Sequence, residues 1–194
     1  MTNRSIALLA EDDTDCDTVR RIVHRVLSDS TKTKKWAAKG CGELRRKLPA
    51  KLTAMSKEGC TVFIVVHDLD LNPDNGFLND EVKLRETLEK KASNLTDGRK
   101  HICIPVEEME AWFWSDPGVV RYVGQGKGKA NENPHQIRSP KEELLKLSRS
   151  ENRKPRYSTN MNVELAAMLN LELCSQRCPS FKNLLRFLHS LQAD

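Results

Sequence analysis

The sequence has few aromatic residues and no long apolar stretch. Aromatic side chains make up 5% of the 194 residues, hydrophobic residues 38% and charged residues 30%. No run approaches the eighteen or so apolar residues of a membrane-spanning helix, and the apolar stretch near the N-terminus is too short for a signal peptide. Because apolar segments still recur and both charge signs are interspersed, we expect a folded cytoplasmic protein without membrane contact.

Close cysteine pairs are also scarce. Of the six cysteines, only Cys174 and Cys178 lie within four positions of each other, and no second close Cys or His pair completes a zinc site. We therefore expect reduced thiols, several of them buried. The glycine- and lysine-rich segment 124–129 lacks the spacing of a nucleotide-binding P-loop.

Positive charge is concentrated in two segments. Residues 32–51 contain eight basic residues against one acid, and residues 127–156 contain nine against four, although the whole chain carries a net charge of only +5. The rest of the chain is therefore net acidic. Basic flanks around an acidic centre are typical of proteins that act on polyanions, but an ordinary solvated surface would have the same composition.

Apolar runs and amphipathic segments alternate over the first hundred residues. The runs predict strands at 5–10, weakly at 34–38, and strongly at 61–66 and 101–106. Helical spacing predicts helices at 17–27, at 42–55 with a break near Pro49, and at 80–92, with turns at 72–76 and 94–98. This alternation predicts an α/β fold with a doubly wound, mainly parallel sheet.

The second half of the chain has a different pattern. A helix is expected to begin at residues 107–114, followed by a long mobile loop that ends near Pro140. Three further helices are expected at 141–148, 162–169 and 181–191. We therefore predict an α/β core over residues 1–117 and a C-terminal helical extension over residues 118–194 that packs on it.

Acidic residues follow two of the predicted strands. Glu11 and Asp15 come after the first strand, and Asp68 and Asp70 come after the strand at 61–66. Parallel sheets place their binding sites at the carboxyl ends of strands, so these side chains are expected to share one crevice. Crowded carboxylates repel one another, and Mg²⁺ relieves that repulsion. The alternative for Asp15 is that it only caps the following helix.

These acidic motifs resemble those of the TOPRIM fold, found in topoisomerases, primases and overcoming-lysogenisation-defect nucleases. That family places a glutamate after its first strand, in a motif such as E-G-x-x-D, and a D-x-D pair after a later one. Glu11 and Asp15 fit the first motif, although Asp12 replaces the glycine, and Asp68 and Asp70 fit the second. The resemblance implies binding of Mg²⁺, or Mn²⁺, by these carboxylates and cleavage of phosphodiester bonds.

A narrower resemblance covers the second half of the chain. The segments that carry it are Met109–Phe113, Asp116, Tyr122–Gly126, Pro140–Glu142, Tyr157 and Cys178–Phe181. They resemble a bacterial family of small TOPRIM-like proteins of unknown function, often encoded in defence or mobile-element neighbourhoods and sometimes beside an ATPase. This resemblance implies a nuclease effector acting on DNA or RNA, with a possible ATPase partner and a possible oligomeric assembly.

Further residues are candidates for the chemistry. Glu110 could support a second metal ion, as in two-metal phosphoryl-transfer sites. The candidates for contacts with the substrate's phosphates are Arg121, Lys127, Lys129 and His135.

Two other functions remain open. The chain could be a catalytically silent module that binds metal and nucleic acid beside an ATPase. It could also be a phosphoacceptor receiver domain, in which Asp12 and Asp13 hold Mg²⁺ and Asp68 takes the phosphoryl group. Receivers need a lysine after a later strand, however, and here Glu107 and Glu108 follow the strand at 101–106.

Overall fold

Four strands form one sheet in which every neighbouring pair is parallel. The computed structural model describes residues 4–71, 74–95, 98–150 and 154–192. The strand order is β2-β1-β3-β4, and the strands are β1 (Ser5–Ala10), β2 (Lys32–Ala37), β3 (Val62–Val66) and β4 (Arg99–Cys103). The prediction of a doubly wound α/β fold with a helical C-terminal region is confirmed.

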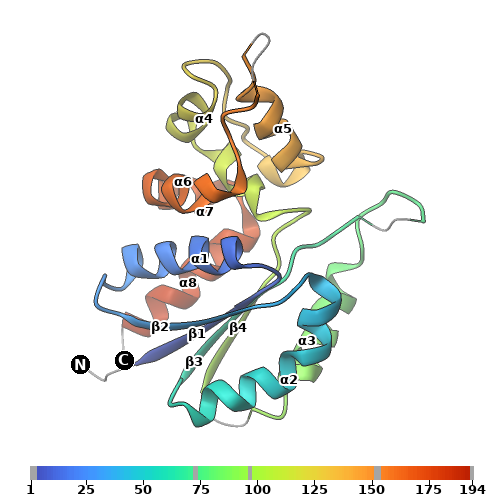
Figure 1. Cartoon of the computed structure of the whole chain (residues 1–194), viewed down its shortest axis with the longest axis vertical. Helices are drawn as coiled ribbons and strands as arrows, with labels where there is room; N and C mark the ends of the chain where they lie inside the picture. The colour runs from blue at the N-terminus through green and yellow to red at the C-terminus, as the bar shows by residue number, and fades with distance from the viewer. Residues whose placement is uncertain (1–3, 72–73, 96–97, 151–153, 193–194) are drawn as a thin grey trace.

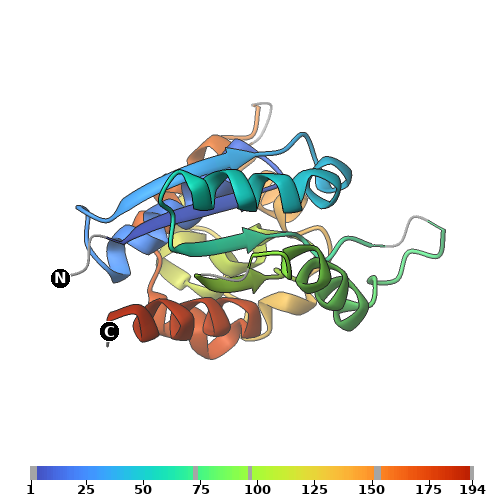
Figure 2. The same ribbon diagram turned by 90° about the horizontal axis from the view of Figure 1, so that it is seen from below.

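Helices cover both faces of this sheet. In Figure 1, α1 and α8 lie on one face, and α2 and α3 on the other; Figure 2 gives the view from below. The α-helices are α1 (Asp13–Val26), α2 (Cys41–Lys57), α3 (Glu81–Ala92), α4 (Pro117–Val123), α5 (Pro140–Leu147), α6 (Asn162–Met168), α7 (Leu171–Arg177) and α8 (Pro179–Gln192). Three short 3₁₀ helices are η1 (Met109–Ser115), η2 (Pro134–Gln136) and η3 (Thr159–Met161). No helix of the described residues combines the length and apolar character needed to cross a bilayer.

Alternation of side chains along the central strands builds two cores. Ile6 and Leu8 of β1 pack in the cluster that includes α1 and α8, whereas Ala7 and Leu9 pack in the cluster of α2 and α3. Both faces of β1 and all of β3 are therefore buried. Strands covered on both sides are continuously apolar, which explains why the sequence predicted both of them.

The connections create a topological switch point between β1 and β3. The chain leaves β1 toward α1 on one face, and it leaves β3 toward α3 on the other face (Figure 1). Because β1 and β3 are neighbours, their outgoing loops diverge and leave a crevice at the carboxyl ends of these strands.

Two N-terminal helices differ from the prediction. Helix α1 begins at Asp13 rather than Asp17, because the Asp12 carboxylate accepts a hydrogen bond from the Asp15 N–H at 2.9 Å and caps the helix. Helix α2 continues through Pro49 instead of breaking there. Its buried side chains recur every four residues and anchor the helix on both sides of the proline: Leu44, Leu48 and Leu52.

The middle of the chain also differs. The strand predicted at 101–106 is β4, which ends at Cys103, and Val106 forms only an isolated bridge with Leu69. The helix predicted from residue 107 is the 3₁₀ helix η1. The predicted turns at 72–76 and 94–98 fall partly on residues 72–73 and 96–97, which lie outside the described residues.

Two helices were missed in the C-terminal half. Helix α4 occupies residues where we expected the basic loop region, and its N-cap is Asp116, whose carboxylate accepts from Gly118 N–H at 2.6 Å. Helix α7 was not predicted at all. Both are seven-residue helices, which are too short to establish a clear helical period in the sequence.

The C-terminal helices complete the core of the sheet. Helix α6 packs against α1, and α8 packs against α1 and β4. The Arg25 guanidinium of α1 donates to the carbonyl oxygens of Ala166 at 2.8 Å and Leu169 at 2.6 Å, which ties α1 to the end of α6. The division into residues 1–117 and 118–194 stays a prediction, but the two segments share one apolar cluster.

Two glycines, Gly59 before β3 and Gly98 before β4, allow a test of how closely the chain packs at the start of β4. Gly98 and Gly59 have φ of +100° and +88°, where L-residues are strained. A Cβ on Gly98 would lie 2.8 Å from Thr61 O and 2.9 Å from Phe63 Cε2, whereas nothing lies within 4 Å at Gly59. We expect Gly98→Ala to lower the free energy of unfolding by about 2–4 kcal/mol and Gly59→Ala by about 1–2 kcal/mol. Urea unfolding measures both, and equal losses would contradict the packing at Gly98.

Candidate metal centre

Carboxylates from four segments converge at the switch point. Glu11 follows β1, Asp15 lies in the first turn of α1, Asp68 and Asp70 follow β3, and Glu110 lies in η1. All five line one hollow of about 200 Å³, here called the acidic hollow. The structure therefore brings together every carboxylate that the sequence assigned to catalysis or metal binding. The other residues that line the acidic hollow are Asp12, Thr14, Glu108, Lys141, Thr159 and Asn162.

Glu11 is held in place by the segment after β3. Its Oε1 accepts from the Asp68 N–H at 3.1 Å and lies 3.1 Å from His67 Nδ1. Burial and the charge of Asp70 raise the pKa of Glu11 to about 7, despite the opposing effect of the Asp68 N–H and Arg45. The carboxylate is therefore oriented by the protein but poorly stabilised as an anion.

The same crowding affects Asp15 and Asp68. Burial, followed by the charges of Asp12 and Glu110, raises the pKa of Asp15 to about 8. Burial, followed by the charges of Asp15 and Glu11, raises the pKa of Asp68 well above its usual value. Asp68 Oδ1 is buried and has no hydrogen-bond partner among the described residues. A buried carboxylate oxygen without a partner is costly, and a divalent cation would satisfy it.

Glu110 is positioned by residues from the C-terminal half. Asn162 Nδ2 donates to Glu110 Oε1 at 3.1 Å, and the Tyr157 hydroxyl lies 3.3 Å from the same oxygen and 2.7 Å from Asn162 Oδ1. Burial raises the pKa of Glu110, and the hydrogen bond from Asn162 partly opposes this. Sequence reasoning missed Asn162 and gave Tyr157 no role, because only the tertiary fold brings residues so distant in sequence to Glu110.

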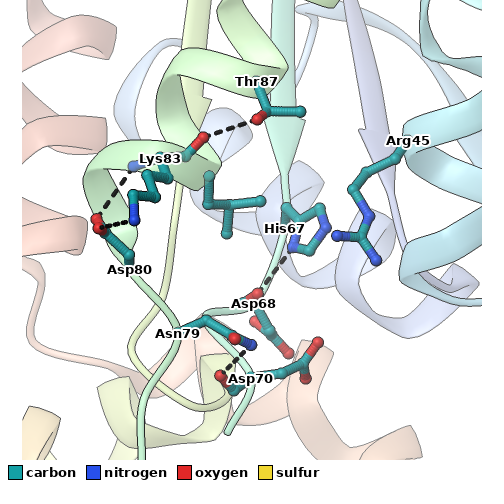
Figure 3. A pocket seen from close by; sticks show the side chains of 9 residues that line it. Arg45, His67, Asp68, Asp70, Asn79, Asp80, Lys83 and Thr87 are labelled. Carbon is teal, nitrogen blue, oxygen red and sulfur yellow. Dashed lines mark hydrogen bonds and ion pairs between the residues drawn. The ribbon is translucent and has the colours of Figure 1, made fainter. Parts of the chain in front are cut away.

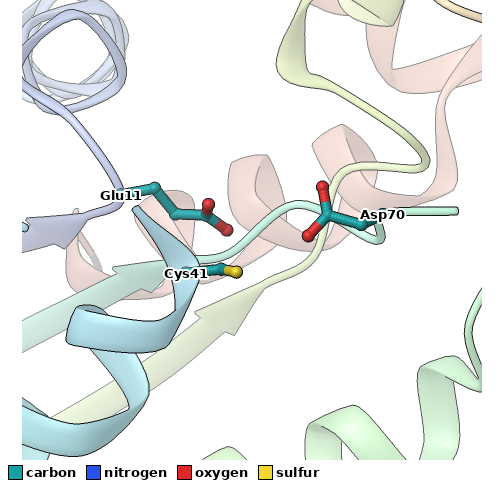
Figure 4. Close-up of side chains that lie close together, drawn as sticks. All are labelled: Glu11, Cys41 and Asp70. Carbon is teal, nitrogen blue, oxygen red and sulfur yellow. The ribbon is translucent and has the colours of Figure 1, made fainter. Parts of the chain in front are cut away.

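Cys41 is a further candidate ligand that the sequence did not indicate. One donor atom each from Glu11, Cys41 and Asp70 lie within 4.8 Å of one another, and Figure 4 shows the three side chains converging. Cys41 begins α2, and three residues separate it from the end of the weakly predicted strand β2. In the sequence, the only indication that Cys41 could be a ligand was its position after a strand of the same parallel sheet.

Basic residues line the edges of the carboxylate cluster. Lys141 Nζ lies 3.3 Å from Glu108 Oε1, and the Lys141 N–H donates to Glu108 Oε2 at 3.0 Å. Arg45 of α2 lies on the other side, where its charge lowers the pKa of Glu11. Neither residue was a candidate from the sequence. Both belong to the basic segments that we identified there, at 32–51 and 127–156.

The structure places the predicted substrate-binding residues elsewhere. Arg121 and Lys129 line a separate hollow beside α4, together with Arg177. Lys127 is exposed in the same loop, and His135 Nδ1 lies 3.3 Å from Arg177 O. None of the four lines the acidic hollow. Their proposed role in binding the substrate therefore lacks a direct connection to the carboxylates.

The replacement of the expected glycine by Asp12 has a simple explanation. Asp12 has φ −145° and ψ 177°, an extended conformation that any residue adopts. No glycine is needed at this position, and the Asp12 side chain caps α1. The turn that places Glu11 in the hollow therefore forms without the glycine of the TOPRIM motif.

Comparison with known proteins identifies a family. Residues 10–189 match the family described as a domain of unknown function, DUF4276, and the chain belongs to this family. No curated protein and no solved structure matches the chain. The match spans both the carboxylates and the C-terminal helices, so the family unit includes the complete site.

The carboxylates predict an unusual dependence of stability on pH in the absence of metal. Asp15 and Glu11 bind protons more tightly in the folded chain than in the unfolded chain, so their contribution favours folding at low pH and is lost as the pH rises through about 7 to 8. We expect the free energy of unfolding in EDTA to fall by about 2 kcal/mol or more between pH 5.5 and pH 8. Urea unfolding at both values measures this.

Asp15→Asn tests the assignment, with Asp13→Asn as its control. Asp13 lies on the same first turn of α1 but is exposed. We expect Asp15→Asn to reduce the pH dependence and Asp13→Asn to retain it. A free energy of unfolding of the wild type that rises toward pH 8 would contradict the proposed crowding of carboxylates in the acidic hollow.

Proposed function

We propose that this protein is a Mg²⁺- or Mn²⁺-dependent phosphodiesterase that cleaves nucleic acid. The observation that carries the proposal is the convergence of five carboxylates at the switch point of a parallel sheet, four of them buried or partly buried and the fifth, Asp70, exposed. Such a cluster is unfavourable without a cation, and switch points are where α/β sheets bind their ligands.

The residues present fit a divalent cation. Glu11, Asp15, Asp68 and Asp70 would hold it, and Asp68 Oδ1 is the buried oxygen that needs a partner. A cation bound there supplies charge stabilisation at phosphoryl oxygens and a nucleophilic water at neutral pH. Carboxylate oxygens suit Mg²⁺ and Mn²⁺ alike, whereas the nearby thiol of Cys41 is a ligand that softer ions prefer.

The protein's own groups provide orientation and charge. The Asp68 N–H and His67 fix the Glu11 carboxylate, while Asn162 and Tyr157 fix Glu110. Glu110 has a raised pKa, which suits a group that accepts a proton from the attacking water near neutral pH.

Lys141 lines the same hollow and could neutralise charge on the phosphate as the P–O bond breaks.

The resemblance to TOPRIM proteins supports the same chemistry. Glu11 after the first strand and Asp68 and Asp70 after the third lie on neighbouring strands, as a shared metal site requires. The proposed cytoplasmic location rests on composition and on the expectation of reduced thiols, whereas the role as a defence effector beside an ATPase rests on the narrower resemblance alone. A receiver domain is less favoured, because Glu107 and Glu108 follow β4 and accept backbone hydrogen bonds from Ser139 and Lys141.

Cleavage of supercoiled plasmid, single-stranded DNA and RNA with Mg²⁺ or Mn²⁺ tests the proposal. We expect Asp68→Asn/Asp70→Asn to lower the rate more than about 100-fold, because it removes ligands on which the chemistry depends. Glu86→Gln/Glu89→Gln makes the same change in charge at exposed positions of α3 and should leave the rate unchanged.

The possible outcomes separate the candidate functions. Activity that survives in the Asp68→Asn/Asp70→Asn variant would overturn the site assignment. If wild type binds nucleic acid but cleaves none of the three substrates with either metal, the catalytically silent module replaces the phosphodiesterase.

A further inference from the structure

A second hollow lies against the same carboxylates. It has a volume of about 310 Å³ and shares Asp68 and Asp70 with the acidic hollow. We call it the α2–α3 hollow, because Arg45 of α2 lines one side and Lys83 of α3 lines the other (Figure 3). Unlike the acidic hollow, it therefore places two cations beside the proposed site of cleavage.

A buried polar group faces this hollow. His67 is only 2% exposed, and its Nδ1 lies 2.7 Å from Asp68 O, which fixes the ring. His67 Nε2 is buried and has no hydrogen-bond partner among the described residues, and Figure 3 shows the ring beside Arg45. Buried polar atoms normally have partners, so this atom indicates a hollow built for a polar ligand.

An apolar arm projects beside the hollow. Phe77, Leu78 and Val82 are 68%, 42% and 65% exposed, and they are three of the four large exposed hydrophobic residues of the described chain. Residues 74–80, which precede α3 and include Phe77 and Leu78, extend away from the sheet in Figures 1 and 2. The base of the arm is fixed to the backbone beside the acidic hollow, because Asn79 donates to the Asp70 carbonyl oxygen from its N–H at 3.1 Å and from its Nδ2 at 2.8 Å.

We propose that the α2–α3 hollow and this arm bind an unpaired strand of nucleic acid as it leaves the cleavage site. The inference rests on the proposed function and specifies its substrate class. Arg45 and Lys83 bind a backbone phosphate next to the one held at the carboxylates, and Phe77 stacks on an adjacent base.

The combination of charge and exposed aromatic surface favours an unpaired strand. A phosphate would meet Arg45 and Lys83 in the hollow, where the metal would neutralise Asp68 and Asp70. The third carboxylate, Asp80, lies 3.6 Å from Lys83 Nζ. Base stacking on an aromatic side chain requires an exposed base face, which a duplex covers with its neighbouring base pairs. A protein interface would explain Phe77 and Val82, but it would not explain the cations and the unpartnered histidine beside them.

The test measures binding separately from cleavage. Fluorescence anisotropy follows a labelled single-stranded oligonucleotide and its duplex in the Asp68→Asn/Asp70→Asn background without added metal. We expect Arg45→Gln/Lys83→Gln to weaken single-strand binding about tenfold and to reduce its salt dependence. Arg46→Gln/Lys90→Gln is the matched control, because these two exposed cations lie on the same helices but outside the hollow. We expect this variant to bind the single strand with unchanged affinity.

Phe77→Ser tests the arm, with Met168→Ser as its control. Met168 is the fourth exposed hydrophobic residue and lies on α6. We expect Phe77→Ser to weaken single-strand binding about tenfold and Met168→Ser to leave it unchanged.

Several results would overturn the inference. They are a duplex bound as tightly as the single strand, an equal loss in the control variants, and unchanged binding in Arg45→Gln/Lys83→Gln. A Phe77→Ser variant that changes a dimer to a monomer in sedimentation without weakening binding would show a protein interface instead. These results leave the phosphodiesterase intact if wild type cleaves nucleic acid. Conversely, wild type that fails to cleave while the binding pattern holds would refute only the catalytic function.

Discussion

Repulsion among partly buried carboxylates is the constraint on which the rest of the site depends. Glu11, Asp15 and Asp68 each have a raised pKa, with burial as the largest cause and neighbouring carboxylates next. The fold opposes this repulsion with directed groups, such as the Asp68 N–H on Glu11 and Asn162 on Glu110. These contacts orient the carboxylates, but they supply little of the positive charge that the cluster lacks.

The C-terminal half is therefore part of the site and of the core. The sheet alone would present Glu11, Asp68 and Asp70 at an open edge, whereas Asn162 and Lys141 close the acidic hollow from the other side. Helix α5 is fixed there because Glu107 and Glu108 accept backbone hydrogen bonds from Ser139 and Lys141 at its N-terminal end. The same elements bury α1, since α6 and α8 pack against it.

The sequence revealed those parts of the site that lie next to strongly patterned strands. β1 and β3 are buried on both faces, so their apolar runs were clear in the sequence. Glu11, Asp68 and Asp70 come just after these runs and could therefore be predicted as site residues. Cys41 and Arg45 were missed because they follow β2, an edge strand that is partly exposed and rich in lysine. Asn162 was missed for another reason: it contacts Glu110 across 52 positions in the sequence, and no local pattern records such a contact. Helix α4 was not predicted because its two turns give little helical periodicity of apolar residues.

The distribution of charge also constrains the order of binding. In the acidic hollow, carboxylates greatly outnumber the single lysine, so a phosphodiester would meet net negative charge there. The α2–α3 hollow adds Arg45, Lys83 and one further carboxylate, Asp80, and it shares Asp68 and Asp70 with the acidic hollow. A bound divalent cation would add two positive charges at the shared carboxylates and so favour both the ionised protein and the anionic substrate. By thermodynamic linkage, cation and nucleic acid would then strengthen each other's binding by the same factor. The crowding that destabilises the metal-free site thus becomes the source of its coupling to substrate.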